Sequence, residues 1–178
     1  MGFLDKILKP APKPSAPAIP EYFNDKKYDG YEVTIVKHDW NSLDAKMNAS
    51  IILKQIQDSG SICASTNNPL TFFYRYDFMI KKAIELYYIS KYVRVTGVSP
   101  ILLINTAIKD KQDAVSGVID RAAEKISKDL KKVKTPKTAL KKIDEFENSF
   151  NDFHDEMSDD NIAKVKSLSE NMRSSYQN

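Results

Sequence analysis

Apolar side chains recur every three or four positions along most of the chain, which is the spacing of one face of an α-helix. The first run follows Asn41 or Ser42, either of which is a good N-cap, and we expect Ser59–Gly60 to end it. Its apolar positions are Leu43, Met47, Ala49, Ile51, Ile52, Leu53 and Ile56. The pattern predicts a first helix between these limits and places Cys63 in the polar loop that follows.

A second and more apolar run begins at Asn68 and Pro69, which suit the N-cap and the first position of a helix. We expect it to extend to about Val95, before the helix breakers Gly97 and Pro100. Its apolar side chains cover more of the circumference than a single buried stripe requires. This helix is therefore expected to be surrounded on several sides.

Three further helices are expected in the second half of the chain. The third starts near Pro100, with a seam at Ile104, Ile108, Val115, Ile119, Ala122, Ile126, Leu130 and Val133. Thr135 and Pro136 begin a fourth, antiparallel to the third, with a seam at Leu140, Ile143, Phe146, Phe150, Phe153 and Met157. Ser158 or Asp159 caps a fifth, with apolar positions Ile162, Val165, Leu168, Met172 and Tyr176. The pattern predicts an all-α fold, an elongated bundle of about five helices with coiled-coil-like seams.

The first twenty residues differ from the rest of the chain. Residues 10–20 hold five of the eight prolines and predict an extended polyproline linker. Residues 1–9 are an amphipathic peptide if they are helical, with Asp5, Lys6 and Lys9 on the polar side. The apolar side consists of Phe3, Leu4, Ile7 and Leu8. Four interpretations of this peptide are open: it is a frayed tail, it docks on its own domain, it docks on a partner protein, or it makes peripheral contact with a membrane.

Residues 21–178 are expected to form one helical domain, because a chain of 178 residues suffices for one well-buried core. Around residues 31–37, β-branched side chains after an Asp29–Gly30 turn signal predict a short strand or an extended lead-in. The opening residues have no secretory signal pattern, and no apolar run is long enough to span a membrane. The cytoplasm is therefore the expected compartment.

The formal net charge is only +3, but the charges are unevenly distributed. Residues 125–142 contain eight lysines and one acid, whereas residues 143–160 contain eight acids and no lysine or arginine. Closely spaced ammonium groups bind phosphate backbones, so a nucleic-acid-binding accessory protein is the alternative function. Its candidate residues are Lys128, Lys131, Lys132, Lys134, Lys137, Lys141 and Lys142. The cluster lacks arginines and aromatics to read or stack bases, and lysines also cover solvated helix faces or meet acidic protein or lipid surfaces.

The residues suited to catalysis are few and scattered. One cysteine, Cys63, and two histidines, His38 and His154, exclude an intramolecular disulfide and a clustered zinc site. Asp152 and His154 sit about 200° apart on a helix and do not converge. Glycine-rich phosphate loops and nucleophile motifs are absent from the sequence. We therefore expect no catalytic residue, no metal, no cofactor and no enzymatic activity.

Eight of the eighteen aromatic residues lie between Phe72 and Tyr92, and five of these are tyrosines. Tyrosine hydroxyls need water or a polar partner, so tyrosines often rim an interface; the alternative is that they edge the core. The candidate partner-binding residues are Tyr74, Arg75, Tyr76, Tyr87, Tyr88 and Tyr92. The preferred interpretation is a non-enzymatic protein-interaction or scaffold module that binds another protein or a second copy of itself.

Within residues 65–77, an Asn-Pro-x-Thr-Phe-Phe core is followed closely by Arg75. This stretch of thirteen residues resembles a segment of uncharacterised helical proteins from low-GC Gram-positive bacteria and their phages. The resemblance implies a helical fold and a bacterial or phage source. It brings no activity with it.

Overall fold

The computed structural model describes residues 42–90 and 95–176, without the side chains of residues 42–45. These two ranges are helical and contain no strand, which confirms the all-α fold. The α-helices are α1 (Ser42–Ser65), α2 (Pro69–Ile89), α3 (Pro100–Lys109), α4 (Lys111–Leu130), α5 (Pro136–Asn151) and α6 (Asp159–Ser174). A short 3₁₀ turn, His154–Glu156, joins the last two. The predicted strand at 31–37 lies outside the described residues.

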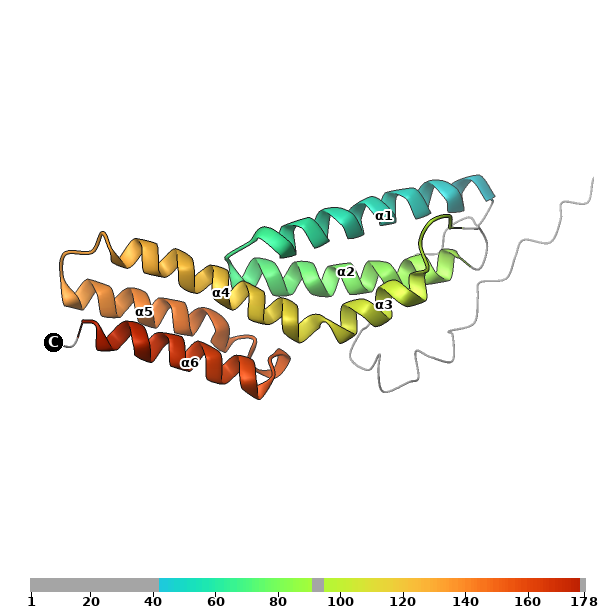
Figure 1. The fold of residues 1–178 in the computed structure, drawn as a ribbon. Helices are drawn as coiled ribbons and strands as arrows, with labels where there is room; N and C mark the ends of the chain where they lie inside the picture. The colour runs from blue at the N-terminus through green and yellow to red at the C-terminus, as the bar shows by residue number, and fades with distance from the viewer. Residues whose placement is uncertain (1–41, 91–94, 177–178) are drawn as a thin grey trace, which may run out of the picture.

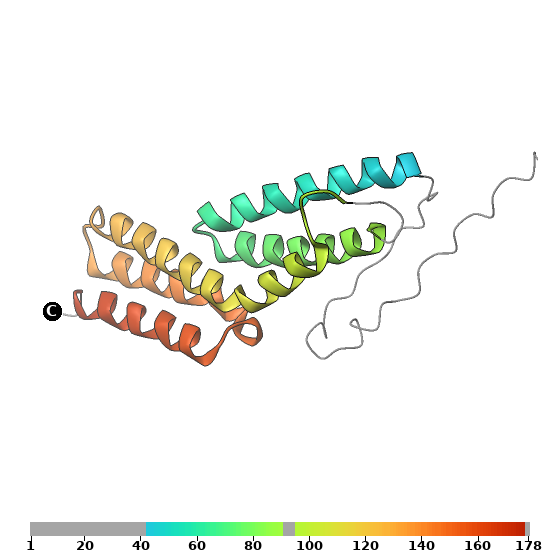
Figure 2. The ribbon, with the colours of Figure 1, turned by 45° about the vertical axis from the view of Figure 1, so that its right-hand side comes forward.

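The helices form an elongated bundle with two overlapping halves (Figure 1). In one half α1 and α2 run antiparallel, and α3 lies along α2. In the other half α4, α5 and α6 pack side by side. The turned view keeps this arrangement, with the α1–α2 turn meeting α4 at the middle of the molecule (Figure 2). The centre of the molecule is therefore where segments distant in sequence come together.

Side-chain caps explain why most of the helices begin where they do. The Asn68 carboxamide oxygen accepts the backbone N–H of Thr71 at 3.1 Å, and Pro69 occupies the first turn of α2. Thr135 and Ser158 cap α5 and α6 in the same way. The three helix starts predicted from the sequence at these caps are confirmed.

The core is centred on α2, whose second half is buried all round from Ala83 to Ile89. Phe72, Ile80 and Ile84 are fully buried, and they join Ile104, Val115 and Ile119 from α3 and α4. The expectation that this helix is surrounded on several sides is confirmed. Val95 is not helical and residues 91–94 lie outside the described ranges, so α2 itself ends at Ile89.

The predicted end of the first helix at Ser59–Gly60 is wrong, because α1 continues to Ser65. A glycine is tolerated there: a Cβ at Gly60 would lie 3.7 Å from the Met79 sulfur, which is ordinary contact. The extra turns bury Cys63, whose Sγ lies 3.7 Å from the Phe72 carbonyl oxygen. Tertiary burial therefore outweighs the local cost of glycine within a helix, which is about 1 kcal/mol.

An arginine from α4 closes the C-terminal end of α1. Arg121 donates from Nε to the Thr66 carbonyl and from Nη2 to the Cys63 carbonyl, both at 2.7 Å. The last carbonyls of a helix lack partners within the helix, and a cation stabilises the negative end of its dipole. A Cβ at Gly117 would lie 3.2 Å from Nη1 of Arg121, so this glycine leaves room for the guanidinium group. The contact joins the two halves of the bundle.

The predicted single third helix is divided in two at Asp110, whose φ and ψ are −90° and 4°. The Tyr76 hydroxyl donates to the Ala107 carbonyl at 2.8 Å. In an uninterrupted helix this carbonyl would accept the backbone N–H of the residue four positions later. The break lets α3 lie along α2 while α4 packs on α5 and α6 (Figure 1). The predicted fourth helix is also shorter than expected, because α5 ends at Asn151. Phe153 and Met157, which were expected on that helix, therefore lie beyond its end.

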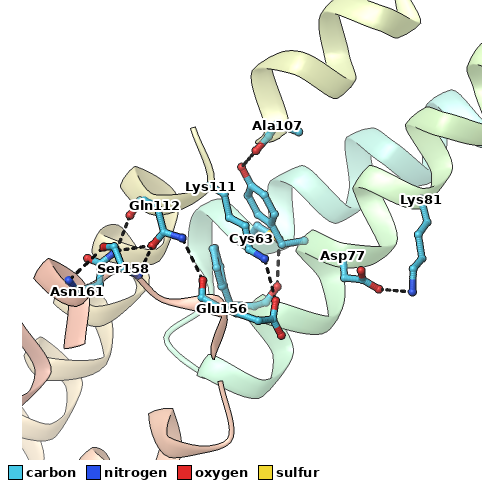
Figure 3. A network of polar contacts seen from close by, with 11 residues as sticks. Cys63, Asp77, Lys81, Ala107, Lys111, Gln112, Glu156, Ser158 and Asn161 are labelled. Atoms are coloured by element: carbon cyan, nitrogen blue, oxygen red, sulfur yellow. Dashed lines mark hydrogen bonds and ion pairs between the residues drawn. The ribbon is translucent and has the colours of Figure 1, made fainter. Parts of the chain in front are cut away.

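A polar cluster ties the start of α4 to the start of α6 (Figure 3). The Gln112 side chain accepts the Ser158 backbone N–H at 2.9 Å and donates to the Glu156 carbonyl at 3.0 Å. Asn161, which is 5% exposed, donates to the backbone and side-chain oxygens of Gln112, both at 3.0 Å. Lys111 forms an ion pair with Glu156 at 2.8 Å. This cluster fixes the α5–α6 turn against α4.

Replacing Asn161 by alanine removes both of its hydrogen bonds to Gln112, while the Gln112 side-chain oxygen keeps the Ser158 N–H. We expect Asn161→Ala to lower the free energy of unfolding in urea by about 1–3 kcal/mol. Asn171→Ala, at an exposed position of the same helix, is the matched control and should change it by less than about 0.5 kcal/mol. Equal effects of the two substitutions would contradict the role assigned to the cluster.

Candidate protein-interaction site

The first two turns of α2 present an exposed apolar pair beside an exposed cation. Leu70 is 52% exposed and Tyr74 is 68% exposed, and their spacing of four places them on one face. Arg75 is exposed next to them. The cap at Asn68 fixes this orientation, because it starts the helix so that Phe72 points into the core.

An open groove of about 390 Å³ lies beside Leu70, between the start of α2 and the helices α4 and α5. We call it the central groove. Phe146 and Phe153 form apolar parts of its wall. Polar and charged side chains also line it: Asn67, Asn68, Lys125, Glu145, Ser149 and Asp152. A surface of this mixed kind can hold an apolar group and orient it through polar contacts.

Ring stacking positions the wall of the central groove. Phe153 stacks on Phe73 of α2, with ring centroids 4.3 Å apart and planes 12° apart. On α5, Phe146 and Phe150 meet edge to face at 5.5 Å. Such ring pairs contribute about 0.5–1.5 kcal/mol beyond the area that they bury. The wall of the groove is therefore held by one ring stack between the two halves and one ring contact within α5.

A second hollow, also of about 390 Å³, continues from the central groove along α4. Both are lined by Asn67 and Lys125. The continuation carries charges of both signs, including Glu124, Lys128 and Lys132. Glu124 contacts Lys128 at 2.6 Å, and this hydrogen bond lowers the pKa of the Glu124 carboxyl. The hollow leads from the exposed pair on α2 to the α4–α5 hairpin.

The tip of the α4–α5 hairpin carries the predicted lysine cluster on its surface. Six of the candidate lysines are exposed and Lys142 is half-buried; the exposed ones are Lys128, Lys131, Lys132, Lys134, Lys137 and Lys141. Lys128, Lys132 and Lys141 form ion pairs with carboxylates of their own helices or of the adjoining turn. Within residues 42–90 and 95–176, Lys131, Lys134 and Lys137 have no carboxylate within 4.0 Å. A small apolar cluster of Leu130, Ala139 and Ile143 supports the tip.

Most of the candidate tyrosines lie in the core. Tyr76, Tyr87 and Tyr88 are 7% exposed or less, and burial raises the pKa of the Tyr88 hydroxyl. Tyr92 lies outside the described residues, as does the whole N-terminal peptide with Phe3, Leu4, Ile7 and Leu8. Tyr74 and Arg75 are thus the members of the predicted set that the structure places on the surface.

The residues considered for chemistry do not converge. Cys63 is buried in α1, and Asp152 and His154 are exposed in and near the α5–α6 turn. In the described part of the chain, no three His, Cys, Asp or Glu side chains gather closely enough to hold a metal ion. His38 lies outside that part.

None of the helices within residues 42–90 and 95–176 is long and apolar enough to cross a bilayer. No family model matches the chain, and no curated protein or solved structure matches it either. The surfaces described above are therefore interpreted from their own chemistry.

The thiol of Cys63 should be unreactive in the folded protein, because burial raises its pKa to about 11. Only the thiolate reacts, and at pH 8 about one such thiol in a thousand is ionised. We expect negligible alkylation by iodoacetamide at pH 8 in buffer and full alkylation in urea, followed by mass spectrometry. A cysteine added by Ser61→Cys, at an exposed position of α1, is the positive control. Fast labelling of Cys63 without denaturant would contradict the burial described here.

Proposed function

We propose that this protein is a non-enzymatic protein-interaction module, and that it binds its partner through Leu70, Tyr74, Arg75 and the central groove. The observation that carries the proposal is the exposed pair Leu70 and Tyr74 on one face of α2, of which Leu70 lines an open groove of about 390 Å³. The partner is another protein or a second copy of this chain, and the proposed compartment is the cytoplasm.

The chemistry of the surface supports a protein partner. Tyrosine and arginine are enriched among the residues that dominate binding energy, because each offers a large contact area and a polar end. Here Tyr74 and Arg75 stand side by side, and Leu70 extends the apolar part towards the groove. A partner side chain inserted between Phe146 and Leu70 would bury apolar surface, while Glu145 and Lys125 would orient its polar groups.

A photo-crosslinking amino acid in place of Tyr74 tests this surface in the host cell. We expect a discrete crosslinked product with Tyr74→benzoylphenylalanine, identified by mass spectrometry as a second protein or as a dimer of this chain. The same amino acid at Lys54, which is exposed on α1, is the control and should give no such product. Identical adducts from both positions, or none from Tyr74, would overturn the proposal.

With the partner purified, substitutions measure the contribution of the exposed pair. We expect Tyr74→Ala to weaken binding by about 2 kcal/mol, which is roughly thirtyfold in Kd, as measured by titration calorimetry. Leu70→Ala should weaken it less, and Leu102→Ala is matched to it because Leu102 is 64% exposed on α3. Unchanged affinity in both α2 variants would place the contact elsewhere.

A nucleic-acid-binding accessory role is the second candidate, favoured by the exposure of the lysine tip. Lys131, Lys134 and Lys137 have no carboxylate partner among the described residues, so their charges are free to meet phosphates. Ammonium groups that neutralise phosphates release counterions and make binding strongly dependent on salt. The absence of arginine from residues 125–142 argues for backbone contact without base reading.

Salt-dependent filter binding to duplex DNA and to single-stranded RNA tests this second function. If it holds, alanine at Lys131, Lys134 and Lys137 together should lower affinity and reduce the slope of log K against log salt by up to about 2.7. Alanine at Lys54, Lys109 and Lys166, exposed on other helices, removes the same charge and is the control. No retention of either nucleic acid at low salt would eliminate this function.

A further inference from the structure

The other side of α2 borders a second groove, which we call the lateral groove. It lies between α1 and α3, with α2 as its floor, and has a volume of about 230 Å³. Its apolar lining consists of Ile56, Met79, Ala83, Leu103 and Ala107. Tyr74 is five and nine positions from Met79 and Ala83, so it faces about 140–180° away from them on the helix. Tyr74, and Leu70 on the same face, therefore lie on the other side of α2 from the lateral groove, whereas Arg75, four positions before Met79, lies closer to it.

The polar side chains that line the lateral groove are few: Tyr76, Thr106 and Asp110. The Tyr76 hydroxyl at its floor already donates to the Ala107 carbonyl at 2.8 Å. Asp110 lies at its edge, where α3 ends, and is exposed. Within the described ranges its carboxylate has no ion pair, and it makes no capping hydrogen bond to α4. The groove thus offers an apolar trough with a negative charge at one end.

We propose that residues 2–9 of this same chain dock in the lateral groove. An amphipathic helix binding in an apolar groove is a common mode of peptide recognition. The peptide matches this trough in kind: Phe3, Leu4, Ile7 and Leu8 share one side of it. Lys6 lies about 60° from Phe3 at the border of that side and supplies the cation that the Asp110 carboxylate lacks, whereas Lys9 lies on the opposite side of the helix.

The length of chain before α1 permits this docking. Ile56 lies fourteen positions after Ser42, which is about 21 Å along the helix axis. Residues 10–20 alone span about 30 Å in a polyproline conformation, and residues 21–41 add to that reach. The peptide therefore reaches the groove of its own chain.

The chain that links the peptide to α1 and the charge of Asp110 argue against a second copy of the chain and against a membrane as the occupant of the groove. A tether of this length gives an effective concentration in the millimolar range, which favours the groove of the same chain over that of a second copy. The carboxylate of Asp110 would repel an anionic membrane surface, whereas it attracts a lysine of the peptide. Docking would bury the apolar side of the peptide and the trough together.

Paramagnetic relaxation in the full-length protein tests the proposal. In a Cys63→Ala background, a spin label attached after Lys109→Cys lies on α3 next to Asp110. The matched control label is attached after Lys166→Cys, exposed on α6 in the other half. We expect the methyl signals of Leu4, Ile7 and Leu8 to broaden at least severalfold with the first label and to stay unchanged with the second. Circular dichroism confirms that each labelled variant is folded.

Two further samples separate the remaining outcomes. Ile7→Asp should abolish the broadening of the Leu4 and Leu8 signals, whereas Asp5→Asn, on the polar side of the peptide, should preserve it. Equal broadening from both labels, or none from either, would overturn the proposal. Broadening that appears only when isotope-labelled and spin-labelled chains are mixed would assign the groove to a second copy and overturn it too. Photo-crosslinking at Tyr74 is independent of all these results.

Discussion

The bidentate contact of Arg121 with the end of α1 is the interaction on which the rest of the arrangement depends. It supplies donors to the Cys63 and Thr66 carbonyls, where the helix has none of its own. In doing so it ties the α1–α2 turn to α4, beside the apolar core and the Phe73–Phe153 stack that also join the two halves. The central groove exists because of this junction, since its walls come from the turn on one side and from α4 and α5 on the other.

The contrast between helix starts and helix ends shows how far local chemistry determines this fold. Asn68, Thr135 and Ser158 cap their helices through contacts within three residues, so the sequence predicts them correctly. The predicted end of the first helix at Ser59–Gly60 and the predicted unbroken third helix across residue 110 are wrong, because both outcomes depend on distant partners. Arg121 extends α1 past the glycine, and the hydroxyl of Tyr76 occupies a carbonyl just before the break at Asp110. Neither partner is visible in a local pattern.

The candidate site is predictable only where local sequence determines it, as with the helix starts. Helical spacing shows that Leu70 and Tyr74 share a face, and composition shows that the segment is rich in tyrosine. Which face remains exposed depends on where the neighbouring helices lie, and Tyr76, Tyr87 and Tyr88 are buried in the assembled bundle. Leu70 was not among the residues chosen from the sequence, because an apolar side chain in an apolar helix gives no signal of exposure. The exposure of the lysines at the hairpin tip is easier to predict from the sequence, since charged side chains at a turn are nearly always solvated.

The uneven division of the core has a consequence for how the molecule moves. The main cluster runs through α1, α2, α3 and the adjoining parts of α4, α5 and α6. The hairpin tip rests on a smaller cluster of three buried residues, Leu130, Ala139 and Ile143, with four partly buried apolar side chains around them. Local opening costs least where few apolar side chains are buried. The tip can therefore unwind and re-form while the centre stays intact, which gives the lysines freedom to follow an irregular surface.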